Sequence, residues 1–167
     1  KSDLNKALDM GVDWVALSFV QTKKAQLGGL LELIIYFWGR PESIISAFEG
    51  DPDLLTILQN HWDSVSGVEI SEFILSNILS EIEISYNGTD PKQTPAITTV
   101  LSGWKDFPAL HRTVASITLD KYCHDKKINH IDLLNITVRG NTARVIQGAE
   151  QLLHRSAVDL VIVELTG

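Results

Sequence analysis

The chain has 167 residues, a length that fits one domain spanning residues 1–167. Hydrophobic residues make up 44% of it, which is enough to form a core and argues against intrinsic disorder. The net charge of −7 argues against a nucleic-acid partner, because phosphate backbones are bound by clustered positive charge. No apolar run reaches the length of a bilayer span, so we expect a soluble, cytoplasmic chain with no membrane partner.

Thiol and metal chemistry find little support in the sequence. The single cysteine, Cys123, cannot form an intrachain disulfide. No set of Cys and His has zinc-site spacing, so we expect no metal, and His124 and His130 are interpreted as solvated or capping residues. Neighbouring Lys121 and Lys126 could lower the pKa of the thiol, but a partly buried, inert cysteine is the favoured interpretation.

Hydrophobic spacing and turn residues predict alternating helices and strands in the first part of the chain. A helical pattern at residues 2–10 precedes an apolar strand at 14–20 and a buried helix at 27–38. A strand at 43–48 is followed by a helix up to residue 62, with Asp51 as its N-cap and Pro52 in its first turn.

The second part continues the alternation. We predict strands at 68–75, 81–86, 131–138 and 158–165, with a hairpin-type turn at Asn87-Gly88 and an irregular connection at 90–108. A helix at 118–126 is capped by Thr118 or Asp120. Another helix, at 142–154, is predicted to direct six residues inward: Ala143, Val145, Ile146, Ala149, Leu152 and Leu153.

This alternation predicts an α/β fold with a mostly parallel sheet and helices on both of its faces. In such sheets, ligands bind beyond the carboxyl ends of the strands, where the strand order reverses. The polar residues that follow each strand are therefore the candidate binding residues.

Two of these strand ends carry groups suited to a nucleoside. Glu49 follows the strand at 43–48, and a carboxylate there can accept hydrogen bonds from both hydroxyls of a ribose. Alternatively, Glu49 and Asp51 only cap the following helix. Ser76 and Asn77 follow the strand at 68–75, where the Asn77 amide could contact an adenine edge or simply occupy a turn.

The strand at 131–138 ends in a row of polar side chains. Asn135, Thr137 and Arg139 share one face, because side chains alternate along a strand. Arg139, which precedes Gly140 and a helix, could hold an anion or remain a solvated charge.

Four stretches of the chain resemble the FkbM family of S-adenosylmethionine-dependent methyltransferases. They read SAFEGDPDLLTILQNHW, GVEISEFILSNILSEIEISYNG, SITLDKYCHDKKINHIDLL and GNTARVIQGAEQLLHRSAVDLVIVEL, in family order, and the resemblance covers about residues 28–167. It implies a Rossmann-like class I methyltransferase fold and S-adenosylmethionine as cofactor. It also implies O-methylation of a small-molecule or sugar-like hydroxyl.

The resemblance also assigns roles to individual residues. Glu49 corresponds to the acid that holds the cofactor ribose, and Ser76 and Asn77 correspond to the family's Ser-Asp near the adenine. Asp120 matches an acid of the family's Thr-Leu-Asp-Asp segment, and Gly29 stands in place of the last glycine of the cofactor loop.

Departures from the family pattern support an alternative. The family's Lys-Ile-Asp-Val-Glu-Gly stretch reads Asn135-Ile136-Thr137-Val138-Arg139-Gly140 here, which makes Asn135, Thr137 and Arg139 uncertain catalytic candidates. Only Gly29 remains of the first glycine motif, and the last two strands of the family sheet are expected to be missing. The alternative function is a non-catalytic, degenerate or chimeric methyltransferase-like domain that binds the cofactor weakly or not at all.

The two ends of the chain raise further hypotheses. DLNKALDMGVDWVALSFVQTKK resembles a short segment of the pyruvate kinase barrel, so residues 1–27 are either of different origin or similar to that segment by chance. At the other end, the apolar strand at 158–165 would leave an open sheet edge, which could support a homo-oligomer.

Overall fold

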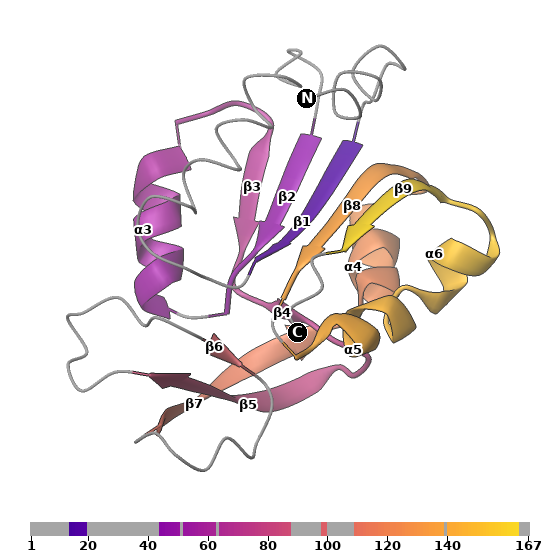
Figure 1. Cartoon of the computed structure of the whole chain (residues 1–167). Coiled ribbons are helices and arrows are strands. Elements are labelled where there is room, and N and C mark those ends of the chain that lie inside the picture. The colour runs from indigo at the N-terminus through magenta and orange to yellow at the C-terminus, as the bar shows by residue number, and fades with distance from the viewer. Residues whose placement is uncertain are drawn as a thin grey trace.

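The computed structural model describes residues 14–19, 44–50, 52–62, 64–87, 98–99, 109–138 and 140–163. The helices predicted at 2–10 and 27–38, together with Gly29, Asp51 and Arg139, lie outside these residues. The described elements combine helices and strands in a mixed α/β fold (Figure 1). In chain order they are β1 (Trp14–Phe19), β2 (Ile44–Phe48), α3 (Pro52–Trp62), β3 (Val68–Ser71), β4 (Ile74–Leu75), β5 (Ser80–Asn87), β6 (Thr98–Thr99), β7 (Ala109–Ile117), α4 (Leu119–Lys126), β8 (Ile131–Thr137), α5 (Thr142–Gln147), α6 (Glu150–His154) and β9 (Val158–Val163).

A five-stranded parallel sheet forms the larger part of the fold. Its strand order is β3-β2-β1-β8-β9, and all four neighbouring pairs are parallel, as the sequence predicts. β1 lies between β2 and β8, so the strand order reverses there. The apolar runs predicted as strands at 14–20, 43–48, 131–138 and 158–165 correspond to β1, β2, β8 and β9.

One face of this sheet packs against α4, α5 and α6. Leu134 and Ile136 of β8 and Phe48 of β2 share a core with buried residues of all three helices. Tyr122 of α4 joins this core to β2, because its hydroxyl donates a buried hydrogen bond to Ser46 Oγ at 3.0 Å. Its ring also meets Phe48 edge to face, with centroids 4.7 Å apart. α4 and the central strands are thus connected by apolar packing and one specific polar contact.

A second sheet lies beyond the carboxyl ends of the parallel strands (Figure 1). Its order is β4-β7-β5-β6, with β5 antiparallel to both β6 and β7. The alternation predicted at 81–86 is confirmed, since Ile82 and Ile84 are buried while Glu81 and Glu83 are exposed. Asn87, the first residue of the predicted hairpin-type turn, belongs instead to β5, which pairs with residues 98–99 and with β7, while Gly88 lies outside the described residues.

The predicted strand at 68–75 is two strands in two different sheets. β3 pairs with β2, whereas β4 pairs with β7 after a short bend at Glu72 and Phe73. An unbroken run of strand-forming residues does not reveal such a change of partner, because pairing is decided by distant parts of the chain. Strand β7 was not among the predicted elements.

The helix predicted at 142–154 divides into α5 and α6. A Cβ added at Gly148 would lie 2.0 Å from the Ser76 carbonyl oxygen, so the backbone approaches closely there. The break changes the inward face: Val145, Ala149 and Leu152 are buried, but Ala143 and Ile146 are exposed. The prediction that those two point inward is therefore wrong.

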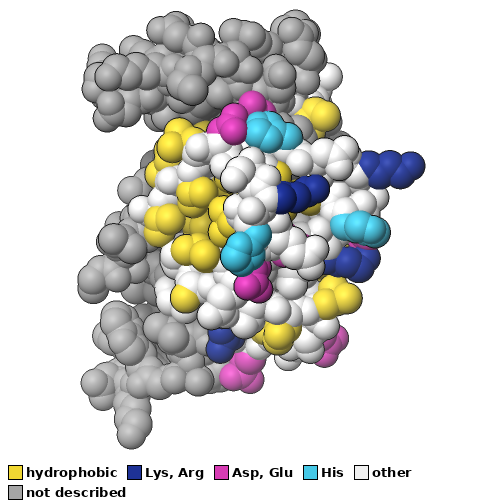
Figure 2. All heavy atoms as spheres, turned by 90° about the vertical axis from the view of Figure 1, so that its right-hand side faces the viewer, with side chains coloured by type: hydrophobic (Ala, Val, Ile, Leu, Met, Phe, Trp, Pro, Cys, Tyr) yellow, Lys and Arg dark blue, Asp and Glu magenta, His cyan; other side chains and the backbone are white. Residues whose placement is uncertain are grey.

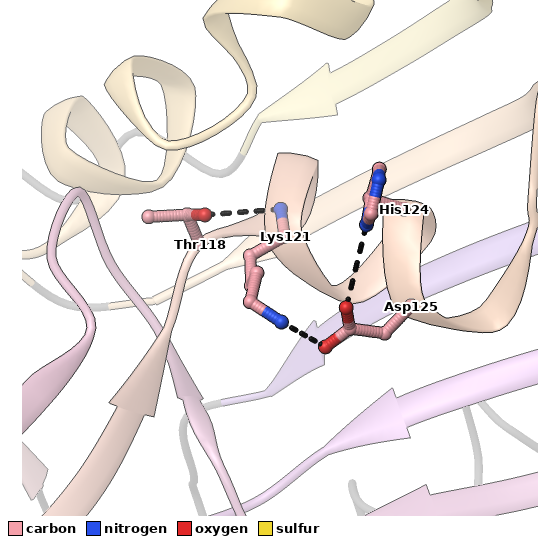
Figure 3. A network of polar contacts seen from close by, with 4 residues as sticks. All are labelled: Thr118, Lys121, His124 and Asp125. Atoms are coloured by element: carbon pink, nitrogen blue, oxygen red, sulfur yellow. Dashed lines mark hydrogen bonds and ion pairs between the residues drawn. The ribbon is translucent and has the colours of Figure 1, made fainter.

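Helix α4 begins and continues through local polar contacts (Figure 3). Thr118 is its N-cap, as one of the two predicted alternatives has it, and Thr118 Oγ1 accepts from Lys121 N at 3.1 Å. Lys121 and His124 both contact Asp125, and hydrogen bonding, from Lys121 first, lowers the pKa of that carboxyl. These contacts lie on the solvent side, so the charged residues of α4 that make them have a structural explanation.

Strand β9 forms an apolar edge of the parallel sheet. Among the described residues it pairs only with β8, and Leu160, Val161 and Ile162 are exposed although they alternate between two faces. Figure 2, which views this side of the molecule, shows hydrophobic side chains gathered in one area. A homo-oligomer through this edge stays a prediction. Within the described part of the chain, every helix is too short or too polar to cross a bilayer.

The contact between Gly148 and Ser76 gives a test of the fold. Gly148→Ala would force a methyl group against a backbone carbonyl, so we expect the free energy of unfolding to fall by about 1–3 kcal/mol in urea denaturation. Arg144→Ala, on the exposed surface of α5, is the control and should change it by less than about 0.5 kcal/mol. Equal effects of the two variants would contradict the close approach.

Candidate site at the carboxyl edge of the parallel sheet

The carboxyl ends of β1, β2 and β8 lie at one edge of the parallel sheet, next to the four-stranded sheet (Figure 1). In open α/β sheets, a crevice forms at this edge where neighbouring strands continue in opposite directions around the sheet. Here that point is the pair β1–β8. Glu49, Asn135 and Thr137, all singled out in the sequence, lie at these strand ends.

The strand register places these three residues on the same face. Ala47 and Asn135 both pair with Leu17, so their side chains project from the same side of the sheet. Glu49 and Thr137 each lie two residues further along and therefore share that side. Because one strand separates β2 from β8, Glu49 and Thr137 are roughly 10 Å apart across the sheet.

Glu49 is held firmly at the end of β2. Its backbone N–H donates to Ser71 O at 3.0 Å, which extends the pairing of β2 with β3, and the residue is only 3% exposed. The chain then turns tightly: a Cβ added at Gly50 would lie 2.4 Å from Cγ1 of Ile74. The backbone at Glu49 is thus fixed, and the buried side chain lies at the carboxyl end of β2.

Asn135 carries a buried side-chain amide near the carboxyl end of β8. The residue is 5% exposed, and its Nδ2 has no hydrogen-bond partner among the described residues. Leaving a buried donor unsatisfied costs about 1–3 kcal/mol, a cost that a ligand acceptor would remove. Asn135 therefore stays a candidate binding residue.

Asn141 is a further buried amide that the sequence did not single out. It precedes α5, and its Nδ2 donates to Leu75 O at 2.7 Å, while its Oδ1 has no partner in the described part of the chain. This contact holds the end of β4 against the start of α5. An Asn that precedes a helix is usually interpreted as an N-cap, so the sequence does not indicate the long-range contact of Asn141 with Leu75.

Ser76 and Asn77 lie on a different side of the parallel sheet from Asn135. Ser76 is buried against Gly148, and Asn77 Nδ2 donates to Gln147 Oε1 at 2.9 Å. These contacts place the pair with α5 and α6, whereas Asn135 faces the other side of β8. Their predicted position near an adenine stays a prediction.

Asp120 has a structural task. Its two carboxylate oxygens accept from the backbone N–H groups of Gln151 and Leu152, at 2.9 and 3.0 Å. These amides lie in the first turn of α6 and have no partner within the helix. Asp120, which matches an acid of the family's Thr-Leu-Asp-Asp segment, thus connects α4 to α6.

The comparison with protein-family models gives one match, to the methyltransferase FkbM domain, over residues 41–167. The chain belongs to the FkbM methyltransferase family. The matched segment contains β2, β8 and the polar residues at their ends, but β1 and residues 1–40 precede it. The resemblance of the N-terminal segment to pyruvate kinase stays a prediction. No curated protein and no solved structure matches the chain.

Cys123 does not contribute a nucleophile to this FkbM domain. It belongs to α4 and is buried on the side of the helix that packs into the core shared with β8. Burial, and secondarily the charge of Asp120, raise the pKa of its thiol to about 12, while Arg155 acts in the opposite direction. A thiol with this pKa is almost entirely protonated near neutral pH, which supports the interpretation of an inert cysteine.

Thiol labelling tests this assignment. In the folded chain at pH 8, we expect Cys123 to react with a disulfide reagent at least about a hundredfold more slowly than in urea, because both burial and its raised pKa suppress the thiolate. The colour released by the reagent measures the rate. Rapid, complete labelling of the folded chain would contradict the described environment.

Proposed function

We propose that this FkbM domain binds S-adenosylmethionine at the carboxyl edge of the parallel sheet and transfers its methyl group to a hydroxyl of a small-molecule or sugar-like acceptor. Family membership supports the methyltransferase class. Numbered along the chain, the strands of this sheet run in the order 3-2-1-4-5, as in Rossmann-like folds that bind nucleotides at the reversal. The observation that carries the proposal is the shared face of Glu49 and Asn135.

The residues at this face fit such a cofactor. Glu49 offers two carboxylate oxygens to the vicinal hydroxyls of a ribose. The unsatisfied amide of Asn135 would donate to a polar atom of the cofactor or of the acceptor. Thr137 lies two residues further along β8, on the same face. When bound, S-adenosylmethionine supplies a methyl group made electrophilic by its sulfonium.

The chemistry that remains for the protein is mainly positioning. A hydroxyl oxygen forms a bond to the methyl carbon as the sulfur–carbon bond breaks, and the hydroxyl proton leaves to water. Neither Asn135 nor Thr137 can remove that proton near neutral pH, because an amide and a hydroxyl are not bases there. Holding the two reactants in line can by itself supply much of the rate acceleration.

Calorimetric titration with S-adenosylmethionine tests the binding step. We expect one site of micromolar affinity and a loss of at least about tenfold in Glu49→Gln, because hydrogen bonds to a charged acceptor are worth about 1.5–3 kcal/mol. Glu72→Gln is the matched control, since Glu72 is exposed after the neighbouring strand β3 and should bind normally.

Two outcomes would contradict the proposed site. One is the absence of heat and of a thermal shift at millimolar cofactor. The other is an equal loss of affinity in Glu49→Gln and Glu72→Gln, which would mean that the effect of Glu49 is not local.

A second candidate is a domain that binds the cofactor without turnover. The neutral side chains of Asn135 and Thr137, where the FkbM pattern resembled here carries a lysine and an aspartate, favour it. Mass spectrometry of the demethylated cofactor, formed in the presence of sugar-like hydroxyl acceptors, distinguishes the two. Product formation that falls in Glu49→Gln supports the transferase, whereas tight binding without product supports the non-catalytic domain.

A further inference from the structure

A separate cluster of side chains lies at the opposite end of the parallel sheet. His130 precedes β8, Asp132 belongs to β8 and Asp159 belongs to β9. His130 Nε2 and Asp159 Oδ2 are 3.1 Å apart, and one ligand atom from each of the three residues lies within 4.8 Å of the others. Among the residues that the structure describes, this is the one group of three potential metal ligands.

The strand register builds this cluster. Ile131 pairs with Val158 and Leu133 with Leu160, so Asp132 and Asp159 stand side by side on neighbouring parallel strands. His130 is two residues before Asp132 and shares its side of the sheet. The backbone beneath them is fixed, because the buried Ile131 donates its N–H to Ala157 O at 2.8 Å.

We propose that His130, Asp132 and Asp159 bind a divalent transition-metal ion of the zinc class. One imidazole nitrogen and two carboxylates suit Zn²⁺, Co²⁺ or Mn²⁺ better than Mg²⁺ or Ca²⁺, which prefer oxygen ligands alone. Two like charges placed directly across neighbouring strands repel each other, and a bound cation reverses that effect. Water would complete the coordination.

The ion would link β8 to the edge strand β9. β9 has β8 as its partner in the described sheet, and its middle residues are exposed on both faces. A metal held by both strands adds a cross-link near their amino ends, roughly 10 Å along β8 from Asn135. Its expected role is therefore stabilisation of the edge strand, and this inference does not depend on cofactor binding.

Two other histidine–carboxylate pairs provide controls on the same chain. His124 contacts Asp125, and His154 lies 3.6 Å from Glu150, but neither pair has a third ligand like that at His130 among the residues that the structure describes. An exposed His–Asp pair alone binds metals weakly, so the third ligand is the distinguishing feature.

Calorimetry with ZnCl₂ tests the proposal on the chain freed of metals and of any purification tag. We expect one site of micromolar affinity, a loss of at least tenfold in both His130→Gln and Asp132→Asn, and no change in His154→Gln. Zn²⁺ should raise the midpoint of thermal unfolding of the unmodified chain but not that of His130→Gln. Co²⁺ should give visible absorption bands characteristic of a site with few ligands.

Binding that survives in His130→Gln, or that falls equally in His154→Gln, would overturn the site and leave adventitious surface binding. The absence of any zinc-dependent heat would overturn it as well. Asp132→Asn is the variant most exposed to a folding defect, because Asp132 is half-buried. Asp159→Asn, at an exposed position, keeps the test valid, and circular dichroism verifies that each variant is folded.

Discussion

The register of β1 between β2 and β8 is the constraint on which the rest of the structure depends. Leu17 pairs with Ala47 on one side and with Asn135 on the other, and this double pairing decides which side chains share a face. A shift of β8 by one residue would turn the Asn135 amide into the apolar core shared with α4, α5 and α6 and move Leu134 and Ile136 to the other face. Burying an amide among apolar side chains is costly, which favours the observed register.

The two faces of the sheet therefore have separate tasks. The face with Phe48, Leu134 and Ile136 is a closed core, tied to β2 through the hydrogen bond from Tyr122 to Ser46. The other face carries the buried residues Ile45, Ala47 and Leu133, with Asn135 and Glu49 towards the carboxyl ends of β8 and β2. Packed strands of this kind would suit the proposed site, where a cofactor has to be held in line with a second reactant.

The features that the sequence predicts best are those determined by local residue patterns. The continuous apolar runs of β2, β8 and β9 and the Thr118 cap of α4 are recognisable without a structure, and so is the position of Glu49 after a strand. Family resemblance adds the methyltransferase class, which the family match confirms.

What the sequence did not reveal depends on contacts between distant segments. The break between α5 and α6 lies where the backbone at Gly148 meets the carbonyl of Ser76, and the bend between β3 and β4 lies where the chain passes from one sheet to the other. The unsatisfied amide of Asn135 is visible only once its surroundings are known. His130 was interpreted as a solvated residue because Asp159, its partner, lies on another strand.

Nuclear magnetic resonance of the Asn135 side-chain amide tests the central claim most directly. The signal of Nδ2 is assigned by its loss in Asn135→Ser, and the folded chain is titrated with S-adenosylhomocysteine, the demethylated form of the cofactor. If the polar face binds this ligand, the Asn135 amide signal shifts while that of the exposed Asn129 stays in place. Saturable binding that leaves the Asn135 signal unmoved would show that the ligand occupies another part of the molecule.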